Sequence, residues 1–134
     1  LMRYKLDIPA QHIHQVLAQA HMFVGESATM ASECAVLGTP AIYLNSTHYG
    51  STDSQSGYGL MDLFPSDESG QTQAISLAVE IACNPDIKNE HAQNLARMLS
   101  EKIDVSAFMV WLVQKYPESI ITMKKHPNLK EMFN

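Results

Sequence analysis

The sequence predicts an α/β fold, in which a parallel sheet of about three strands has helices on both faces and is followed by a helical C-terminal third. Short apolar runs over 22–25, 41–44 and 58–64 are typical of buried strands. Apolar side chains at helical spacing occupy the stretches between and after these runs. Hydrophobic residues make up 46% of the 134 residues, so the chain has enough apolar surface for a core.

The first half of the chain predicts a strand–helix–strand unit. Residues 10–20 carry apolar side chains at i, i+3, i+4 and i+7 and predict the first helix. A second helix follows the strand at 22–25 and ends at Gly38, with Pro40 just beyond, because Gly and Pro in this order are ordinary stop signals. The strand at 41–44 completes a βαβ unit, whose two strands are parallel, as in a partial Rossmann-like sheet.

The segment 45–57 is polar and rich in Gly and Ser, and it predicts a long loop that is functional or disordered. After the strand within 58–64, the spacing predicts helices over 72–83, 84–99, 104–116 and 118–125. Asn84 and Asp104 are the expected N-caps of the second and third of these helices. In the first of them, the side chains expected to face inward are Ala74, Ile75, Ala78, Val79 and Ala82.

The predicted helix over 104–116 is apolar nearly all round, which is typical of a helix covered on more than one side. It either belongs to the core of this domain or faces a missing N-terminal domain or a second copy of the chain. A missing domain is expected because Leu1 begins in mid-pattern and three strands make a thin sheet. We therefore expect one domain over 1–134, the C-terminal half of a larger protein, with a βαβ core over 1–65 and a helical part over 66–134.

The composition argues against several classes of partner. The net charge is -5, and no stripe of Lys and Arg could neutralise phosphates, so we expect neither nucleic-acid binding nor attraction to an anionic membrane. The longest apolar run, Val105–Val113, is far shorter than the roughly 20 residues of a spanning helix. Cys34 and Cys83 are expected as buried thiols rather than a disulfide. We expect a cytoplasmic protein, which in its full length could be peripheral to the inner membrane.

The segment from Glu26 to Glu33 carries the clearest chemistry. Ser27, Ala28 and Thr29 stand where a strand ends and a helix begins. The first N–H groups of that helix lack partners within it, and together with the helix dipole they form an anion site. Small side chains allow a phosphate to approach, and Glu26 is expected to face the same cleft. Because ligands of open α/β sheets bind at the carboxyl ends of strands, the sequence predicts a phosphate site here.

Glu33 lies six residues after Ser27, more than one and a half helical turns along. A carboxylate at that place can accept hydrogen bonds from a ribose diol. The alternative is that Ser27 is only an N-cap and Glu33 lies on a solvated face. Neither the dinucleotide fingerprint nor a Walker A pattern is present, and no cofactor is expected. No metal site is expected either, since His12 and His14 lie on different helix faces. His12 could still face the ligand cleft.

The segment over 23–44, with its Ser-x-Thr turn, Glu33 and Leu37-Gly38-Thr39-Pro40, resembles the C-terminal domain of GT-B fold glycosyltransferases and of the related UDP-N-acetylglucosamine 2-epimerases. The chain is most similar to a little-characterised branch of glycosyltransferases in bacteria and archaea. In that branch, segments resembling Gly25-Glu26-Ser27-Ala28-Thr29-Met30 recur. So do tails resembling Lys102-Ile103-Asp104-Val105, Trp111 and Tyr116-Pro117-Glu118-Ser119.

The resemblance to the epimerases implies roles for individual residues. Their Ser-Gly-Gly turn, which holds the UDP phosphates, falls on Ser27, Ala28 and Thr29, and their ribose-binding Glu falls on Glu33. Their residue near the uracil falls on Ile13. Both glycines are replaced in this chain, and the arginine that the epimerases carry after the next strand has no counterpart here.

The resemblance therefore implies the UDP-sugar-binding domain of a glycosyltransferase that acts in surface polysaccharide or glycolipid synthesis. The general base would come from the missing N-terminal domain, and the diphosphate would be stabilised without a metal. Two alternatives stay open, a fragment of a UDP-sugar 2-epimerase and a non-catalytic α/β interaction module.

Overall fold

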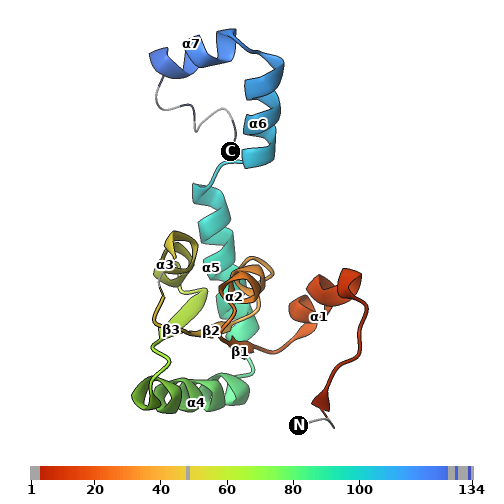
Figure 1. Cartoon of the computed structure of the whole chain (residues 1–134), viewed down its shortest axis with the longest axis vertical. Helices are drawn as coiled ribbons and strands as arrows, with labels where there is room; N and C mark the ends of the chain where they lie inside the picture. Colours follow the sequence, from red (N-terminus) through yellow and green to blue (C-terminus); the bar gives the residue numbers. More distant parts are fainter. Residues whose placement is uncertain (1–3, 48, 127–128, 130–132, 134) are drawn as a thin grey trace. The chain divides into compact units, whose positions relative to one another are not determined.

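The computed structural model describes residues 4–47, 49–126, 129 and 133 (Figure 1). The chain divides into two compact units, Leu1–Leu95 and Ala96–Asn134. In chain order the elements are η2 (Ala10–His12), α1 (Ile13–Gln19), β1 (Phe23–Gly25), α2 (Ala28–Val36), β2 (Ala41–Leu44), α3 (Gly50–Gly57), β3 (Met61–Phe64), α4 (Glu68–Cys83), α5 (Ile87–Glu101), α6 (Val105–Gln114) and α7 (Glu118–Lys125).

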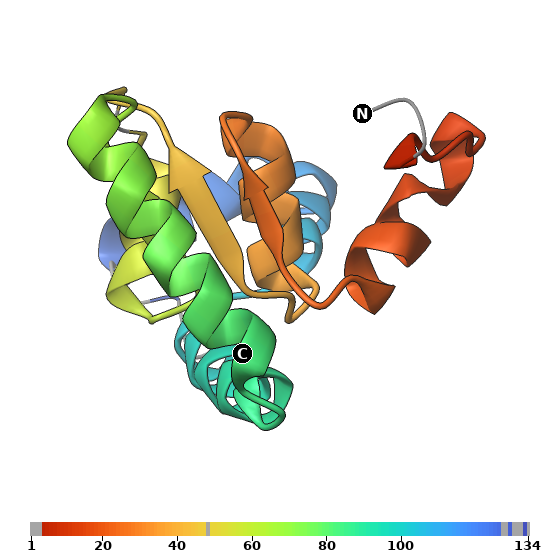
Figure 2. The same ribbon diagram turned by 90° about the horizontal axis from the view of Figure 1, so that it is seen from below.

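The first unit holds a three-stranded parallel sheet in the order β1-β2-β3. Helices α2 and α3 lie on one face of this sheet and α4 on the other (Figures 1 and 2). The predicted fold class, a partial Rossmann-like α/β sheet with helices on both faces and a helical C-terminal part, is confirmed.

Side chains of the central strand β2 alternate between two apolar layers. Ile42 is fully buried against Ala74 and Ile81 of α4. On the other face Tyr43 is buried, as is Cys34 of α2. Full burial of one such side chain stabilises the fold by roughly 1.5–3 kcal/mol, so these two layers hold the sheet between its helices.

Helix α2 ends in a turn at Gly38, as the glycine and the nearby Pro40 predicted. Gly38 has a φ of 76°, and its N–H donates to the Ala35 carbonyl, while the N–H of Thr39 donates to the Cys34 carbonyl at 2.9 Å. This is the hydrogen-bond pattern of a glycine-terminated helix. The buried Thr39 hydroxyl then donates to the carbonyl of Leu17 at 2.8 Å and joins α1 to this turn.

Residues 45–57 do not form the long loop that their composition predicts, because Gly50–Gly57 is helix α3. The Thr52 hydroxyl donates to the Tyr49 carbonyl at 2.8 Å at the start of this helix. Thr52 and Gln55 are buried, and α3 contacts both α2 and β3. Tertiary packing therefore outweighs the weak helix propensity of Gly, Ser, Thr and Asp.

Three further expectations are wrong in detail. Ile75 and Val79 of α4 are 65% and 60% exposed, because α4 packs on the sheet through Ala74 and Ile81. Cys83 is an exposed free thiol, whereas Cys34 is buried as expected. Asn84 does not cap the next helix, since its Oδ1 atom accepts from the N–H of Asp86 and α5 begins at Ile87.

The second unit contains α6 and α7. Asp104 caps α6 as predicted, because its carboxylate accepts from the N–H of Ala107 at 2.9 Å. No residue of α6 is buried, so this helix is not the core helix that one of the two interpretations expects. None of the helices that the structure describes is both long and apolar enough to cross a membrane.

Candidate functional site

An open hollow of about 680 Å³ lies between α2 and α3. From α2 it is lined by Ala28, Thr29, Ser32, Glu33 and Val36, and from the α3 segment by Tyr49, Ser51 and Gln55. Both helices begin just after the carboxyl ends of neighbouring parallel strands. The hollow thus occupies the place where open α/β sheets bind ligands.

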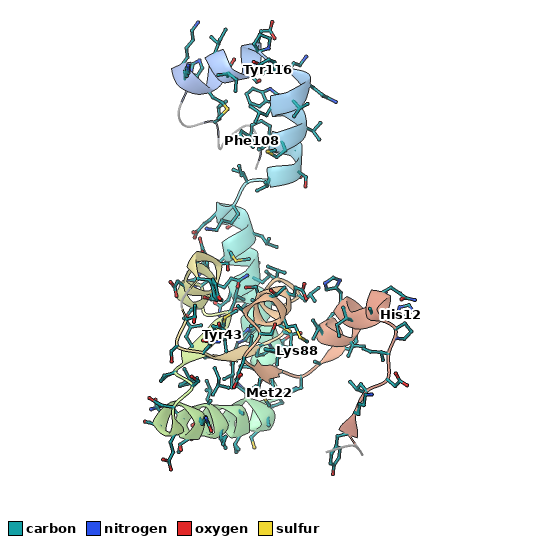
Figure 3. All side chains as sticks on the ribbon, viewed as in Figure 1. His12, Met22, Tyr43, Lys88, Phe108 and Tyr116 are labelled. Atoms are coloured by element: carbon teal, nitrogen blue, oxygen red, sulfur yellow. The ribbon has the colours of Figure 1, made fainter. Side chains whose placement is uncertain are left out.

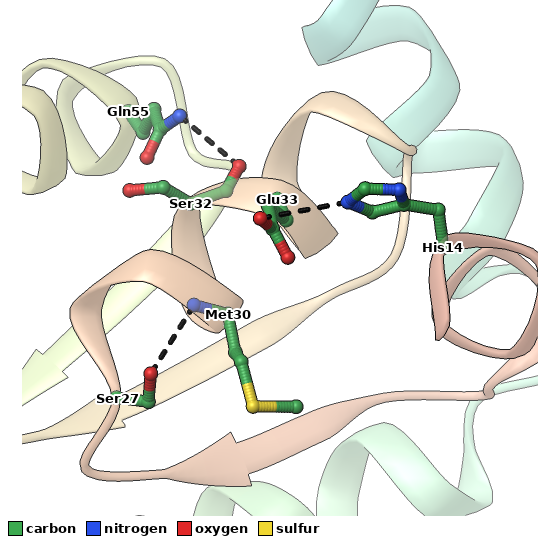
Figure 4. Close-up of polar contacts among 6 residues, drawn as sticks. All are labelled: His14, Ser27, Met30, Ser32, Glu33 and Gln55. Carbon is green, nitrogen blue, oxygen red and sulfur yellow. Dashed lines mark hydrogen bonds and ion pairs between the residues drawn. The ribbon is translucent and has the colours of Figure 1, made fainter. Parts of the chain in front are cut away.

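The α2 side of this hollow begins at the first helical turn. Ser27 is the N-cap, and its Oγ atom accepts from the N–H of Met30 at 3.3 Å (Figure 4). The N–H groups of Ala28 and Thr29 come before the first intrahelical bond, which Ala31 donates to the Ser27 carbonyl. Ser27 therefore caps one amide and leaves two helix-start amides available to a ligand.

Helix α3, on the other side of the hollow, also begins with N–H groups that have no partner within the helix. Its first intrahelical hydrogen bond is donated by Asp53 to the Tyr49 carbonyl, so the N–H groups of Gly50 and Ser51 precede it. A Cβ atom added to Gly50 would meet nothing within 4 Å, which leaves its backbone open to close approach. Two helix starts therefore line one hollow, and their dipoles together favour an anion.

Glu33 lies on the same face of α2 as Thr29, one turn further along. Its Oε1 atom is 3.5 Å from the Nε2 atom of His14 in α1 (Figure 4). The Glu33 side chain is 35% exposed. The carboxylate thus borders the hollow and remains accessible to a ligand that donates hydrogen bonds.

Ser32 and Gln55, from the two helices that line the hollow, are joined by a hydrogen bond. The Gln55 Nε2 atom donates to the Ser32 carbonyl at 3.3 Å, so the Oε1 atom of the same amide points away from that carbonyl (Figure 4). Among the described residues, the Gln55 Oε1 and Ser32 Oγ atoms are buried and have no hydrogen-bond partner. A buried polar group without a partner costs the fold roughly 1–3 kcal/mol, and because these two oxygens are buried, a ligand in the hollow does not reach them in this structure.

The charges around the hollow are few. Glu33 is the single charged side chain among the described residues that line it, so an anion would depend on main-chain N–H groups rather than on Lys or Arg. Behind α2, burial and the neighbouring Glu33 raise the pKa of the Cys34 thiol to about 11. Cys34 is therefore an inert core thiol and not a nucleophile of this site.

The structure brings together some of the residues predicted from the sequence and separates others. Ala28, Thr29 and Glu33 line one hollow, and Ser27 caps the helix beside it. Glu26 instead lines a second, mainly apolar hollow of about 550 Å³ between β1 and α4. His12, whose Nδ1 atom is 2.8 Å from the Gln15 side chain, and Ile13 are not among the lining residues of either hollow.

Three residues that line the hollow, Tyr49, Ser51 and Gln55, were not among the site residues predicted from the sequence. The segment that contains them follows the second strand, so its position at the carboxyl edge of the sheet was the available signal. The polar composition of this segment predicted a loop, so the start of helix α3 was not predicted.

No family model matches this chain, and no curated protein is significantly similar to it. Among the residues that the structure describes, no three His, Cys, Asp or Glu side chains are grouped so that they could hold a metal ion.

Proposed function

We propose that this chain is the donor-binding, C-terminal part of a GT-B-like glycosyltransferase and that the hollow between α2 and α3 binds a UDP-sugar. The observation that carries the proposal is the convergence of two helix starts on one hollow. The N–H groups of Ala28, Thr29, Gly50 and Ser51 would hold the diphosphate, which is the leaving group of the transfer. Stabilisation of that charge by fixed main-chain donors lowers the barrier without a metal ion.

The remaining parts of the ligand have chemically suitable partners. Glu33 would accept hydrogen bonds from the ribose diol, at the distance along α2 that the resemblance to the epimerases implies. The sugar carries hydroxyl groups, and the polar residues Ser32, Ser51 and Gln55 line the same hollow. The general base and the acceptor site would belong to an N-terminal domain, so the chain by itself would bind the donor without turning it over.

Direct titration tests this proposal. A ¹⁵N-labelled sample of the chain is titrated with UDP and, separately, with inorganic pyrophosphate, and the backbone amide shifts are followed. We expect both ligands to move the amides of Ala28, Thr29, Gly50 and Ser51 more than any others. Binding elsewhere, or no binding at millimolar UDP, would contradict the proposal.

A matched pair of variants separates loss of the site from loss of the fold. Gly50 and Gly57 are both in α3, and a Cβ added at either would meet nothing within 4 Å. Gly50 begins the helix beside the hollow, whereas Gly57 ends it away from the hollow. We expect G50V to weaken UDP binding at least about tenfold, a change of about 1.4 kcal/mol, while G57V leaves it unchanged.

A non-catalytic interaction module is the second candidate, because the Ser27 side chain does cap α2. In that case the N-cap has a purely structural role. Titration with UDP would then show no saturable shifts, whereas S27A would still destabilise the fold by about 1 kcal/mol.

A further inference from the structure

Tyr49 is an aromatic residue of the hollow between α2 and α3. Among the described residues that line this hollow it is the single aromatic one, and it is 49% exposed. Tyr43 of β2, by contrast, is 2% exposed and lies in the core of the first unit (Figure 3). Ligand pockets are commonly lined by aromatic side chains, whose flat apolar faces pack against a bound molecule. The function proposed above gives Tyr49 no role.

Hydrogen bonds hold the backbone of Tyr49 in place. Its N–H donates to the Oγ1 atom of Thr52 at 3.3 Å, and its carbonyl accepts from the Thr52 hydroxyl at 2.8 Å. The same carbonyl accepts from the N–H of Asp53 at 3.0 Å, and Thr52 is fully buried. A ligand group that contacts Tyr49 therefore has only the side chain of that residue to order, which lowers the entropy cost of binding.

Helices α2 and α3 lie in register along the hollow. Gln55, the sixth residue of α3, donates to the carbonyl of Ser32, the fifth residue of α2. The amides at the two helix starts therefore lie level with one another. Glu33 lies one turn further along, about 6 Å from Thr29 in the direction of the axis. Tyr49 precedes the first residue of α3, so along the helices it lies on the other side of these amides from Glu33.

The order of the groups in a UDP-sugar matches this arrangement. The diphosphate separates the ribose from the sugar, so a ligand with its diphosphate at the helix starts and its ribose at Glu33 has its sugar on the side of Tyr49. A pyranose carries C–H groups on the faces of its ring, and these pack against an aromatic ring as other apolar groups do. On the basis of the proposed function, we propose that Tyr49 contacts the transferred sugar, with its phenol ring against a C–H face of the pyranose.

Calorimetric titration of the whole chain with UDP-glucose and with UDP tests this assignment. Y49A removes the ring and is expected to weaken UDP-glucose binding at least about fivefold, while the affinity for UDP, which has no sugar, changes by less than about twofold. Y49F retains the ring and is the matched control, for which the affinity for UDP-glucose stays within about twofold of the wild type.

The outcomes separate this inference from the proposed function. A loss confined to UDP-glucose in Y49A supports the contact with the sugar. An equal loss for UDP and UDP-glucose, or no loss for either, overturns that contact while the UDP site itself stands. A wild-type chain that binds neither ligand overturns both proposals.

A measurement on the wild type covers the case in which Y49A does not fold. Nuclear Overhauser effects are recorded between the ring protons of Tyr49 and bound UDP-glucose. We expect them to reach the protons of the glucose ring. Effects that reach only the ribose or the uracil, or no effects from a saturated sample, overturn the inference.

Discussion

The Nε2 atom of His14 lies 3.5 Å from the Oε1 atom of Glu33 and connects α1 to the middle of α2. The His14 side chain is 62% exposed, and ion pairs so exposed to water contribute only about 0–1 kcal/mol. The pair therefore orients the Glu33 carboxylate without occupying both of its oxygens. The second carboxylate oxygen stays available for the ribose of the proposed UDP-sugar.

We expect E33Q to weaken UDP binding about tenfold, because hydrogen bonds to a charged acceptor contribute about 1.5–3 kcal/mol. Inorganic pyrophosphate has no ribose, so its affinity should change by less than about twofold. Isothermal titration calorimetry of both ligands measures the two effects. An equal loss for both ligands would show that Glu33 acts on the phosphates and not on the ribose.

Gly38 holds a left-handed backbone conformation with φ at 76°, which a side chain disfavours. G38A is therefore expected to lower the free energy of unfolding by about 1–2 kcal/mol, as measured by urea denaturation. G57A is the matched control, since Gly57 is helical and has open space around it. A G38A chain as stable as the wild type would contradict this assignment of strain.

The two thiols should react at very different rates. Cys83 is exposed, whereas Cys34 is buried and has a pKa raised to about 11 by burial and by Glu33. Since the thiolate is the reactive form, one thiol per chain should react quickly with a disulfide reagent at neutral pH, and C83S should abolish that phase. A fast phase that persists in C83S would mean that α2 opens readily.

His91 makes the stability depend on pH. Burial lowers its pKa below 6.5, although the Asp62 and Glu90 carboxylates oppose this shift. The unfolded chain thus binds a proton more tightly, so this contribution to stability is lost as the pH falls below 6.5, by at most about 1.4 kcal/mol per pH unit. H91Q should flatten this dependence in urea denaturation. An unchanged slope would contradict it.

Asp62 should act in the opposite direction at lower pH. Burial raises its pKa above 3.8, so the folded chain binds that proton more tightly than the unfolded chain. Its contribution to stability is therefore present below pH 3.8 and declines as the pH rises through the raised pKa. D62N removes this decline. Because the Asp62 carboxylate opposes the lowering of the His91 pKa, D62N also extends the His91 dependence to lower pH, whereas H91Q removes that dependence.

The parts of the fold that depend on local signals could be predicted from the sequence. The second helix ends at Gly38 because glycine there permits the left-handed turn, and the strand that follows is apolar throughout. Helix α3 could not be predicted, since its residues have weak helix propensity. It is stabilised by contacts from far along the chain, such as the bond from Gln55 to the Ser32 carbonyl.

The candidate site also has a part that could be predicted from the sequence and a part that could not. Ala28, Thr29 and Glu33 are neighbours on one helix, so their spacing was enough to place them together. Tyr49 and Gln55 reach the hollow only because α3 packs against α2. The periodicity of the sequence carries no information about which helices pack together, so this half of the site needed the structure.

Strand β1 has three residues, and the N–H of Phe23 donates to the Pro40 carbonyl of the turn before β2. Because backbone groups alternate in direction along a strand, Val24 alone within β1 directs its N–H and C=O away from β2. A strand from another molecule would thus find one hydrogen-bond donor and one acceptor along the free edge of β1. Because β1 is so short, this edge of the sheet offers little backbone for edge-to-edge aggregation. A longer apolar strand would expose more unpaired groups.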